Sequence, residues 1–144
     1  MADSISIALC APARETLHLD ATEVIIPGAE GVFTVLPAHT ALLSTLIPGV
    51  VAVYTSNAGE QHFAVSGGFA EVKDDTVLIL SDALETGDEI DVARAEAAHE
   101  RAEGRLRKPG EDTDLVRAEA SLHRAAARLS AQAKRPHSVN PSRS

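Results

Sequence analysis

The arginines in the C-terminal third of the chain have a spacing that could do chemistry. Arg94 and Arg101 lie seven positions apart, and Arg124 and Arg128 lie four apart, so each pair would share one face of a helix. If two such helices packed antiparallel, Arg94 would approach Arg128 and Arg101 would approach Arg124. Guanidinium groups that converge in this way form an anion site suited to phosphates. The alternative is that these arginines are solvated and pair with glutamates on the same helices.

No other group of residues has the pattern of a catalytic or metal site. The six histidines fall in no HxxH or HExxH motif, and His99 with Glu103 at i,i+4 would supply only half a metal site. The sequence contains no GxSxG, P-loop or GxGxxG motif. Its single cysteine, Cys10, excludes an internal disulfide. We therefore expect no catalytic residue, no metal and no required cofactor.

Charge is divided unevenly between two parts of the chain. The net charge is −8, with 2 Lys/Arg against 13 Asp/Glu in residues 1–90 and 11 against 8 in residues 91–144. The acidic part would repel nucleic acid, and the basic part lacks the aromatic residues that stack on bases. No apolar run approaches the roughly 20 residues that span a bilayer. We expect a soluble, cytoplasmic chain with no nucleic-acid partner and no direct membrane insertion.

Residues 1–88 are expected to form a β-sandwich, or a flattened antiparallel barrel of about eight to ten strands. Apolar and polar residues alternate in the segment SISIAL, which is typical of a half-buried strand. Turn signals, among them Pro48-Gly49 and Gly67-Gly68, separate the predicted strands. These are 4–9, 15–19, 22–27, 31–36, 49–54, 61–65, 68–72 and 76–80. Connections this short leave no room for the helices of a parallel α/β sheet.

Residues 89–133 change to helical periodicity and predict an antiparallel two-helix hairpin broken at 107–112. The predicted seams are Val92, Ala95, His99, Ala102 and Leu106 on the first helix, and Leu115, Ala118, Leu122, Ala125 and Leu129 on the second. We expect Asp88 or Asp91 to cap the first helix, and Asp112 or Thr113 the second. Alanine buries little area, so the hairpin should detach easily. Residues 134–144 are expected to be a disordered tail.

Four segments together resemble the ε subunit of bacterial F-type ATP synthase. They are residues 30–49, 63–72, 76–95 and 112–130. The resemblance implies a non-catalytic subunit of the central stalk. Its sandwich would join the γ subunit to the c-subunit ring, so that proton-driven rotation reaches the catalytic head and drives ATP synthesis. Glu30, Val32 and His39 would belong to the ring-facing surface. Val32 stands where some relatives have a carboxylate, and Ala38 replaces a usual glycine.

The resemblance also implies that the hairpin is a regulatory inhibitor. It would either dock on the sandwich or extend to the catalytic α and β subunits and block ATP hydrolysis. Some relatives bind regulatory ATP through a motif I/L-D-x-x-R-A. The matching residues here are Ile90, Asp91, Arg94 and Ala95, with Glu85, Arg101, Arg124 and Arg128 at the additional positions.

The implied location is peripheral, at the cytoplasmic face of the bacterial inner membrane. Two alternatives stay open: a module whose main role is ATP sensing, and a free-standing adaptor of sandwich and helical hairpin.

Overall fold

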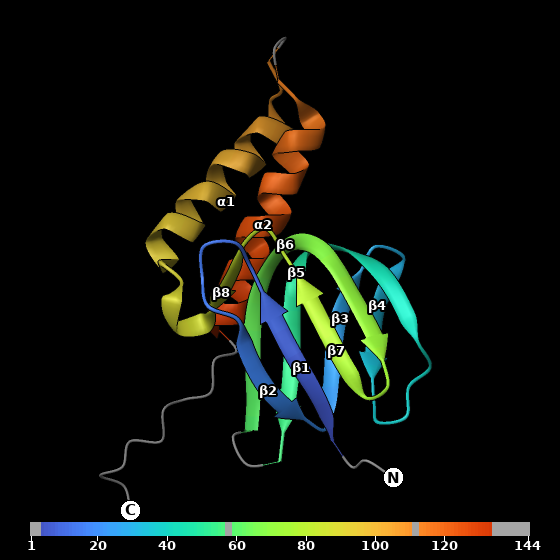
Figure 1. The fold of residues 1–144 in the computed structure, drawn as a ribbon. Coiled ribbons are helices and arrows are strands. Elements are labelled where there is room, and N and C mark those ends of the chain that lie inside the picture. Colours follow the sequence, from blue (N-terminus) through green and yellow to red (C-terminus); the bar gives the residue numbers. More distant parts are fainter. Residues whose placement is uncertain (1–3, 57–58, 111–112, 134–144) are drawn as a thin grey trace, which may run out of the picture.

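The computed structural model describes residues 4–56, 59–110 and 113–133, and places a strand-rich domain before two helices (Figure 1). The predicted disordered tail, 134–144, lies outside the described residues. The strands are β1 (Ile5–Cys10), β2 (Leu17–Ala21), β3 (Glu23–Gly28), β4 (Gly31–Val35), β5 (Leu42–Thr55), β6 (Gly59–Lys73), β7 (Thr76–Leu80) and β8 (Leu84–Thr86). A 3₁₀ turn η1 (Gly87–Glu89) leads to the helices α1 (Val92–Arg107) and α2 (Leu115–Ala133).

The strands form one sheet that folds over on itself to enclose the core. The order is β2-β1-β7-β6-β5-β3-β4, and β8 pairs with β6. The predicted fold class is confirmed, with one difference in strand direction. β1 and β7 pair in parallel, with Ile7 opposite Val77, whereas the other pairs are antiparallel. A parallel pair needs a long connection, and the five strands between β1 and β7 provide it.

The prediction of turns at Pro48-Gly49 and Gly67-Gly68 was wrong. These residues lie inside β5 and β6, which stay paired from one end to the other. Gly67 and Gly68 have φ of 109° and 115°, a region that favours glycine, so the pair bends the strand without ending it. A Cβ at Gly68 would lie 1.9 Å from the carbonyl oxygen of Leu80. The glycines therefore allow a close backbone approach within a continuous strand.

The core of the sandwich is mainly aliphatic, because the inward positions of most strands are Val, Ile or Leu, and buried Phe63 joins them. Alternation buries Ile5, Ile7 and Leu9 on β1 while Ser6 faces outward. The other large, fully buried side chains are Val24, Ile26, Val35, Val51, Val53, Val72, Val77 and Ile79. Each such side chain contributes roughly 1.5–3 kcal/mol when removed from water.

The helices pack along the predicted alanine seam. Ala95 and Ala102 on α1, and Ala118 and Ala125 on α2, are buried. Leu115 was expected in this seam, but it is the first residue of α2 and is 50% exposed. The hairpin is therefore held mainly by small side chains.

The predicted cap of α1 is confirmed, and the cap of α2 is a different residue from those expected. The Asp91 carboxylate accepts the backbone N–H of Arg94 at 3.1 Å. In α2 the carboxylate of Asp114 accepts the N–H of Arg117 at 3.0 Å. The hydroxyl of Thr113 instead accepts an N–H from the preceding loop, and Asp112 lies outside the described residues. Asp114 is the cap because α2 begins at the next residue.

One end of the hairpin rests against the sandwich, where α2 contacts β5 and β6 (Figure 1). The contact is a small apolar cluster of Ala64 on β6, Ile90 after η1, Ala95 on α1 and Ala131 on α2. Ile90 is the largest buried side chain of this cluster and is 8% exposed. This cluster is separate from the sandwich core.

Candidate functional site

A cleft of about 430 Å³ lies where the hairpin leaves the sandwich. Its volume falls within the roughly 300–1,000 Å³ of small-molecule sites. α1 contributes half of the lining residues, and β8, η1, the α1 cap Asp91 and α2 supply the rest. The lining residues are Glu85, Glu89, Asp91, Arg94, Ala95, Ala98, Arg101 and Arg128. The cleft thus joins the sandwich to both helices.

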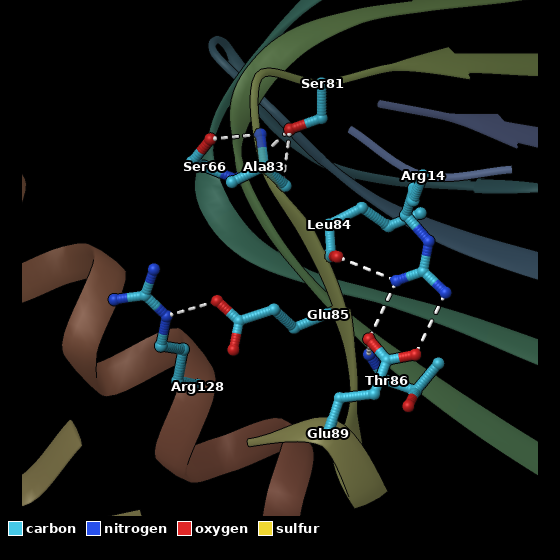
Figure 2. A network of polar contacts seen from close by, with 9 residues as sticks. All are labelled: Arg14, Ser66, Ser81, Ala83, Leu84, Glu85, Thr86, Glu89 and Arg128. Carbon is cyan, nitrogen blue, oxygen red and sulfur yellow. Dashed lines mark hydrogen bonds and ion pairs between the residues drawn. The ribbon is translucent and has the colours of Figure 1, made fainter. Parts of the chain in front are cut away.

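The charged side chains of the cleft are not all paired with each other. Arg128 on α2 donates from Nε to Oε1 of Glu85 on β8 at 2.8 Å (Figure 2). Asp91 is occupied at the start of α1 by the backbone N–H that it accepts. No carboxylate of a described residue lies within ion-pair distance of the guanidinium groups of Arg94 and Arg101. These two cations are therefore available to an anion.

Glu89 is paired with an arginine that lies outside the cleft. Arg14, in the connection between β1 and β2, donates to both carboxylate oxygens of Glu89 at 2.8 and 2.9 Å and to the carbonyl oxygen of Leu84 at 2.9 Å (Figure 2). The hydrogen bond from Arg14 lowers the pKa of the Glu89 carboxyl below its usual value, and the N–H of Thr86 adds to this effect. Arg14 thus fixes η1 to the sandwich.

Sequence reasoning missed this pair. Arg14 and Glu89 are 75 positions apart, and neither belongs to a local motif. Arg14 is one of only two Lys or Arg residues before position 91. That scarcity is the one signal that could have drawn attention to it.

Most of the predicted nucleotide-binding residues come together in the structure. Glu85, Asp91, Arg94, Ala95, Arg101 and Arg128 line the cleft. Ile90 is not in this lining and packs in the apolar cluster instead. Arg124 is absent from this lining: it lies in a narrow neighbouring pocket with Glu85 and Arg128, and its Nη2 donates to the Ser121 hydroxyl at 3.0 Å. Arg124 therefore lies next to the cleft, beside two residues of its lining.

The predicted ring-facing residues lie along the edge strand β4 and not in one cluster. Glu30 precedes the strand, Val32 is exposed on it, and His39 follows it. Glu30 and His39 thus lie beyond opposite ends of a five-residue strand, which is about 17 Å long. Ala38 adopts a positive φ of 67°. Its N–H donates to the Asp75 carboxylate at 2.6 Å, which anchors this loop.

Neither a metal site nor a membrane span is found within the described part of the chain. His99 Nδ1 lies 3.4 Å from Glu103 Oε2, but no third metal-ligating residue joins them, and no other such group occurs in residues 4–56, 59–110 and 113–133. Neither described helix is long and apolar enough to cross a bilayer.

Two family models match consecutive parts of the chain. The model described as "ATP synthase, Delta/Epsilon chain, beta-sandwich domain" matches residues 4–87, and the one described as "ATP synthase, Delta/Epsilon chain, long alpha-helix domain" matches residues 88–132. The chain belongs to the ATP synthase epsilon family. The predicted family is thereby confirmed.

Curated epsilon chains of bacteria resemble most of the sequence. The ATP synthase epsilon chain of Moorella thermoacetica is 45% identical over 105 residues, which are 73% of this chain and 78% of that one. The epsilon chain of Desulfitobacterium hafniense is 42% identical over 106 residues, or 74% and 80% of the two chains. These relatives confirm the prediction of a non-catalytic ATP synthase subunit.

Solved structures of ATP synthases contain the same fold. A chain in the Euglena gracilis mitochondrial ATP synthase, in a structure of OSCP, F1 and the c-ring, superimposes with a TM-score of 0.77 at 25% identity, over 91% of this chain and 82% of that one. A chain in the central stalk and c-ring structure of the Tetrahymena thermophila mitochondrial ATP synthase gives a TM-score of 0.56 at 19% identity, over 89% and 96%. The second likeness extends to the fold alone.

Proposed function

We propose that this epsilon subunit works in the central stalk of a bacterial F-type ATP synthase, peripheral to the cytoplasmic face of the inner membrane. Its sandwich joins the γ subunit to the c-ring and so couples proton-driven rotation to ATP synthesis. Its hairpin restrains ATP hydrolysis when it leaves the sandwich and extends to the catalytic α and β subunits.

The observation that carries the inhibitory part is the small contact between hairpin and sandwich. The buried part of the apolar cluster holds one large side chain, Ile90, among alanines, with half-buried Val50 and Leu129 packed against it. One described ion pair, Arg128 with Glu85, joins α2 to the sandwich. Both partners of this pair are about one-third exposed, which limits its strength. A two-state element needs a gap of only a few kcal/mol between its states, and such a contact fits that range.

The outer face of β5, β6 and β7 supports a protein partner for the sandwich. Leu43 on β5, Phe69 on β6 and Leu80 on β7 are exposed there, and Phe69 pairs directly opposite Leu80. Exposed apolar patches mark protein interfaces. We propose this face for γ. Phe69→Ser should weaken copurification with γ, whereas Leu115→Ser, a change at an exposed leucine of the hairpin, should not.

Removal of the hairpin tests the inhibitory role. A chain that ends before Asp88 keeps all eight strands, and it should raise ATP hydrolysis by the reconstituted catalytic head while it still binds γ. Unchanged hydrolysis with γ bound would refute the inhibitory role. Loss of γ binding would show that the shortened sandwich is damaged. In that case ATP hydrolysis is measured with the full-length Ile90→Ala variant, in which docking of the hairpin is weakened. Unchanged hydrolysis with this variant would also refute the inhibitory role.

We also propose that the cleft binds regulatory ATP, which holds the hairpin in its docked position. The support is that Arg94 and Arg101 have no ion-pair partner among the described residues, and that the cleft volume is in the range of small-molecule sites. A phosphate chain bound to α1 would also lie beside Arg128 of α2, so the ligand would contact both helices. ATP that binds only the docked form stabilises that form by mass action.

Titration calorimetry on the full chain tests this site. ATP should release heat with the unaltered chain, and Arg94→Ala or Arg101→Ala should weaken binding by roughly tenfold, as expected for the loss of a charge-assisted hydrogen bond. Arg107→Ala is the matched control, because it removes a guanidinium from the far end of α1, outside the cleft. No heat at millimolar ATP would remove the nucleotide-binding proposal.

A further inference from the structure

We propose that Arg14 is a positioning residue of the cleft: through Glu89 it sets how strongly the cleft binds an anion. Arg14 does not line the cleft, but its guanidinium bonds to Glu89, which does. This inference rests on the proposed nucleotide site and names a determinant of its affinity that lies outside the I/L-D-x-x-R-A segment.

The charges of the cleft lining balance without Arg14. Arg94, Arg101 and Arg128 face Glu85, Glu89 and Asp91, so the lining alone has no net charge. A polyphosphate would gain little from such a balanced site. Arg14 adds a fourth cation, and the lining with its outer partner becomes positive by one charge.

The positive charge of Arg14 lies against the carboxylate of Glu89. Arg14 donates two N–H···O bonds to Glu89, at 2.8 and 2.9 Å. This bidentate geometry is the one in which a guanidinium neutralises a carboxylate most effectively. Of the three cleft carboxylates, Glu85 is paired with Arg128 and Glu89 with Arg14. Asp91 is therefore the one cleft carboxylate without a basic side-chain partner among the described residues. Asp91 in turn caps α1.

Arg14 also holds the backbone from which α1 starts. Its Nη1 bonds to the Leu84 carbonyl at 2.9 Å, and Glu89 receives the Thr86 N–H at 3.4 Å. Figure 2 shows these contacts clustered around the chain that leaves β8, with Arg128 and Glu85 on the other side of the strand. The same arginine therefore neutralises one acid of the cleft and fixes the segment that carries Glu85 and Glu89.

The experiment compares ATP affinity by calorimetry in four full-length chains: unaltered, Arg14→Ala, Arg14→Ala with Glu89→Gln, and Arg107→Ala. Arg14→Ala exposes the Glu89 charge to the ligand and should weaken binding about threefold to tenfold. Glu89→Gln removes that charge but can still accept the Thr86 N–H. The double variant should therefore return to within about twofold of the unaltered chain. Arg107→Ala changes the net charge by the same amount and should leave affinity unchanged.

Salt separates an electrostatic role from a purely structural one. The difference between Arg14→Ala and the unaltered chain should shrink as ionic strength rises from about 0.05 to 0.5 M, because screening acts on the exposed Glu89 charge. Thermal unfolding of each variant identifies the temperature range in which all are folded.

Three results would overturn the inference. They are equal affinity of Arg14→Ala and the unaltered chain, no recovery in the double variant, and a difference that does not respond to salt. If the unaltered chain itself binds no ATP, the proposed nucleotide site fails first and the inference falls with it. That result is distinct from ATP binding without any effect of Arg14.

Discussion

Replacement of Ile90 by alanine should undock the hairpin while the sandwich stays folded. Ile90 is 8% exposed and packs with Ala64, Ala95 and Ala131 in a cluster separate from the sandwich core. The substitution removes three buried carbons at roughly 0.8 kcal/mol each, and a residual cavity adds to the loss. The docked state should therefore lose about 2–3 kcal/mol, which corresponds to a change of roughly 30- to 150-fold in the docking equilibrium.

Hydrogen exchange on the intact chain measures this effect by region. Amides of α1 and α2 should exchange roughly 30- to 150-fold faster in Ile90→Ala if they open by undocking, because their protection then follows the docking equilibrium. Amides of β5 and β6 should be unchanged, since the sandwich core does not contain Ile90. Leu115→Ala is the control, because this leucine of α2 is 50% exposed and lies outside the cluster.

Two outcomes would refute the reasoning. If helix amides accelerate less than about threefold, Ile90 does not hold the hairpin. If strands and helices lose protection equally, the two parts unfold as one unit and the hairpin is not separately detachable.

Further predictions concern backbone geometry, capping and pH. Gly68→Ala should lower the free energy of unfolding, measured with denaturant, by several kcal/mol, because the new Cβ would lie 1.9 Å from a backbone oxygen. Gly59→Ala, which has open space around it and a φ of 71°, should lower it by only about 1 kcal/mol. Asp91→Ala should lower the stability of α1 by about 1 kcal/mol, seen as faster exchange in its first turns, and equal exchange would refute the cap. The lowered pKa of Glu89 means that its contribution to stability is present above its unfolded value near 4.5 and is lost as pH falls through the folded value. Glu89→Gln should therefore reduce the acid sensitivity of unfolding below pH 4.5, and identical profiles would contradict the pairing with Arg14.

The fold was largely predictable because hydrophobic periodicity carries it. The alternation in β1 and the alanine seam both report which face of an element is buried, and the structure buries those faces. Gly67-Gly68 misled the prediction because glycines at positive φ occur both in turns and in bends of continuous strands. The difference is decided by the partner strand, which local sequence does not contain.

The candidate site was predictable only for residues that share a helix. Spacing places Arg94 and Arg101 on one face of α1, and the antiparallel hairpin brings Arg128 to them. Arg124 was included because it lies four positions from Arg128. That separation is one helical turn, and it places Arg124 outside the cleft lining, where its side chain donates to the Ser121 hydroxyl. Arg14 and Glu89 are 75 positions apart, and their contact depends on the path of the β1–β2 connection. No sequence periodicity encodes that path.

The uninterrupted pairing of β5 with β6 has a mechanical consequence. Their register runs from Leu42 opposite Val72 to Thr55 opposite Gly59, past the glycine bend. A pull along these strands loads many ladder hydrogen bonds in shear at once, whereas separate short hairpins would open one bond at a time. The face proposed for γ and the contact that holds α2 both lie on this same pair of strands. A torque applied at the first surface would thus be borne by the same pair of strands on which the hairpin rests.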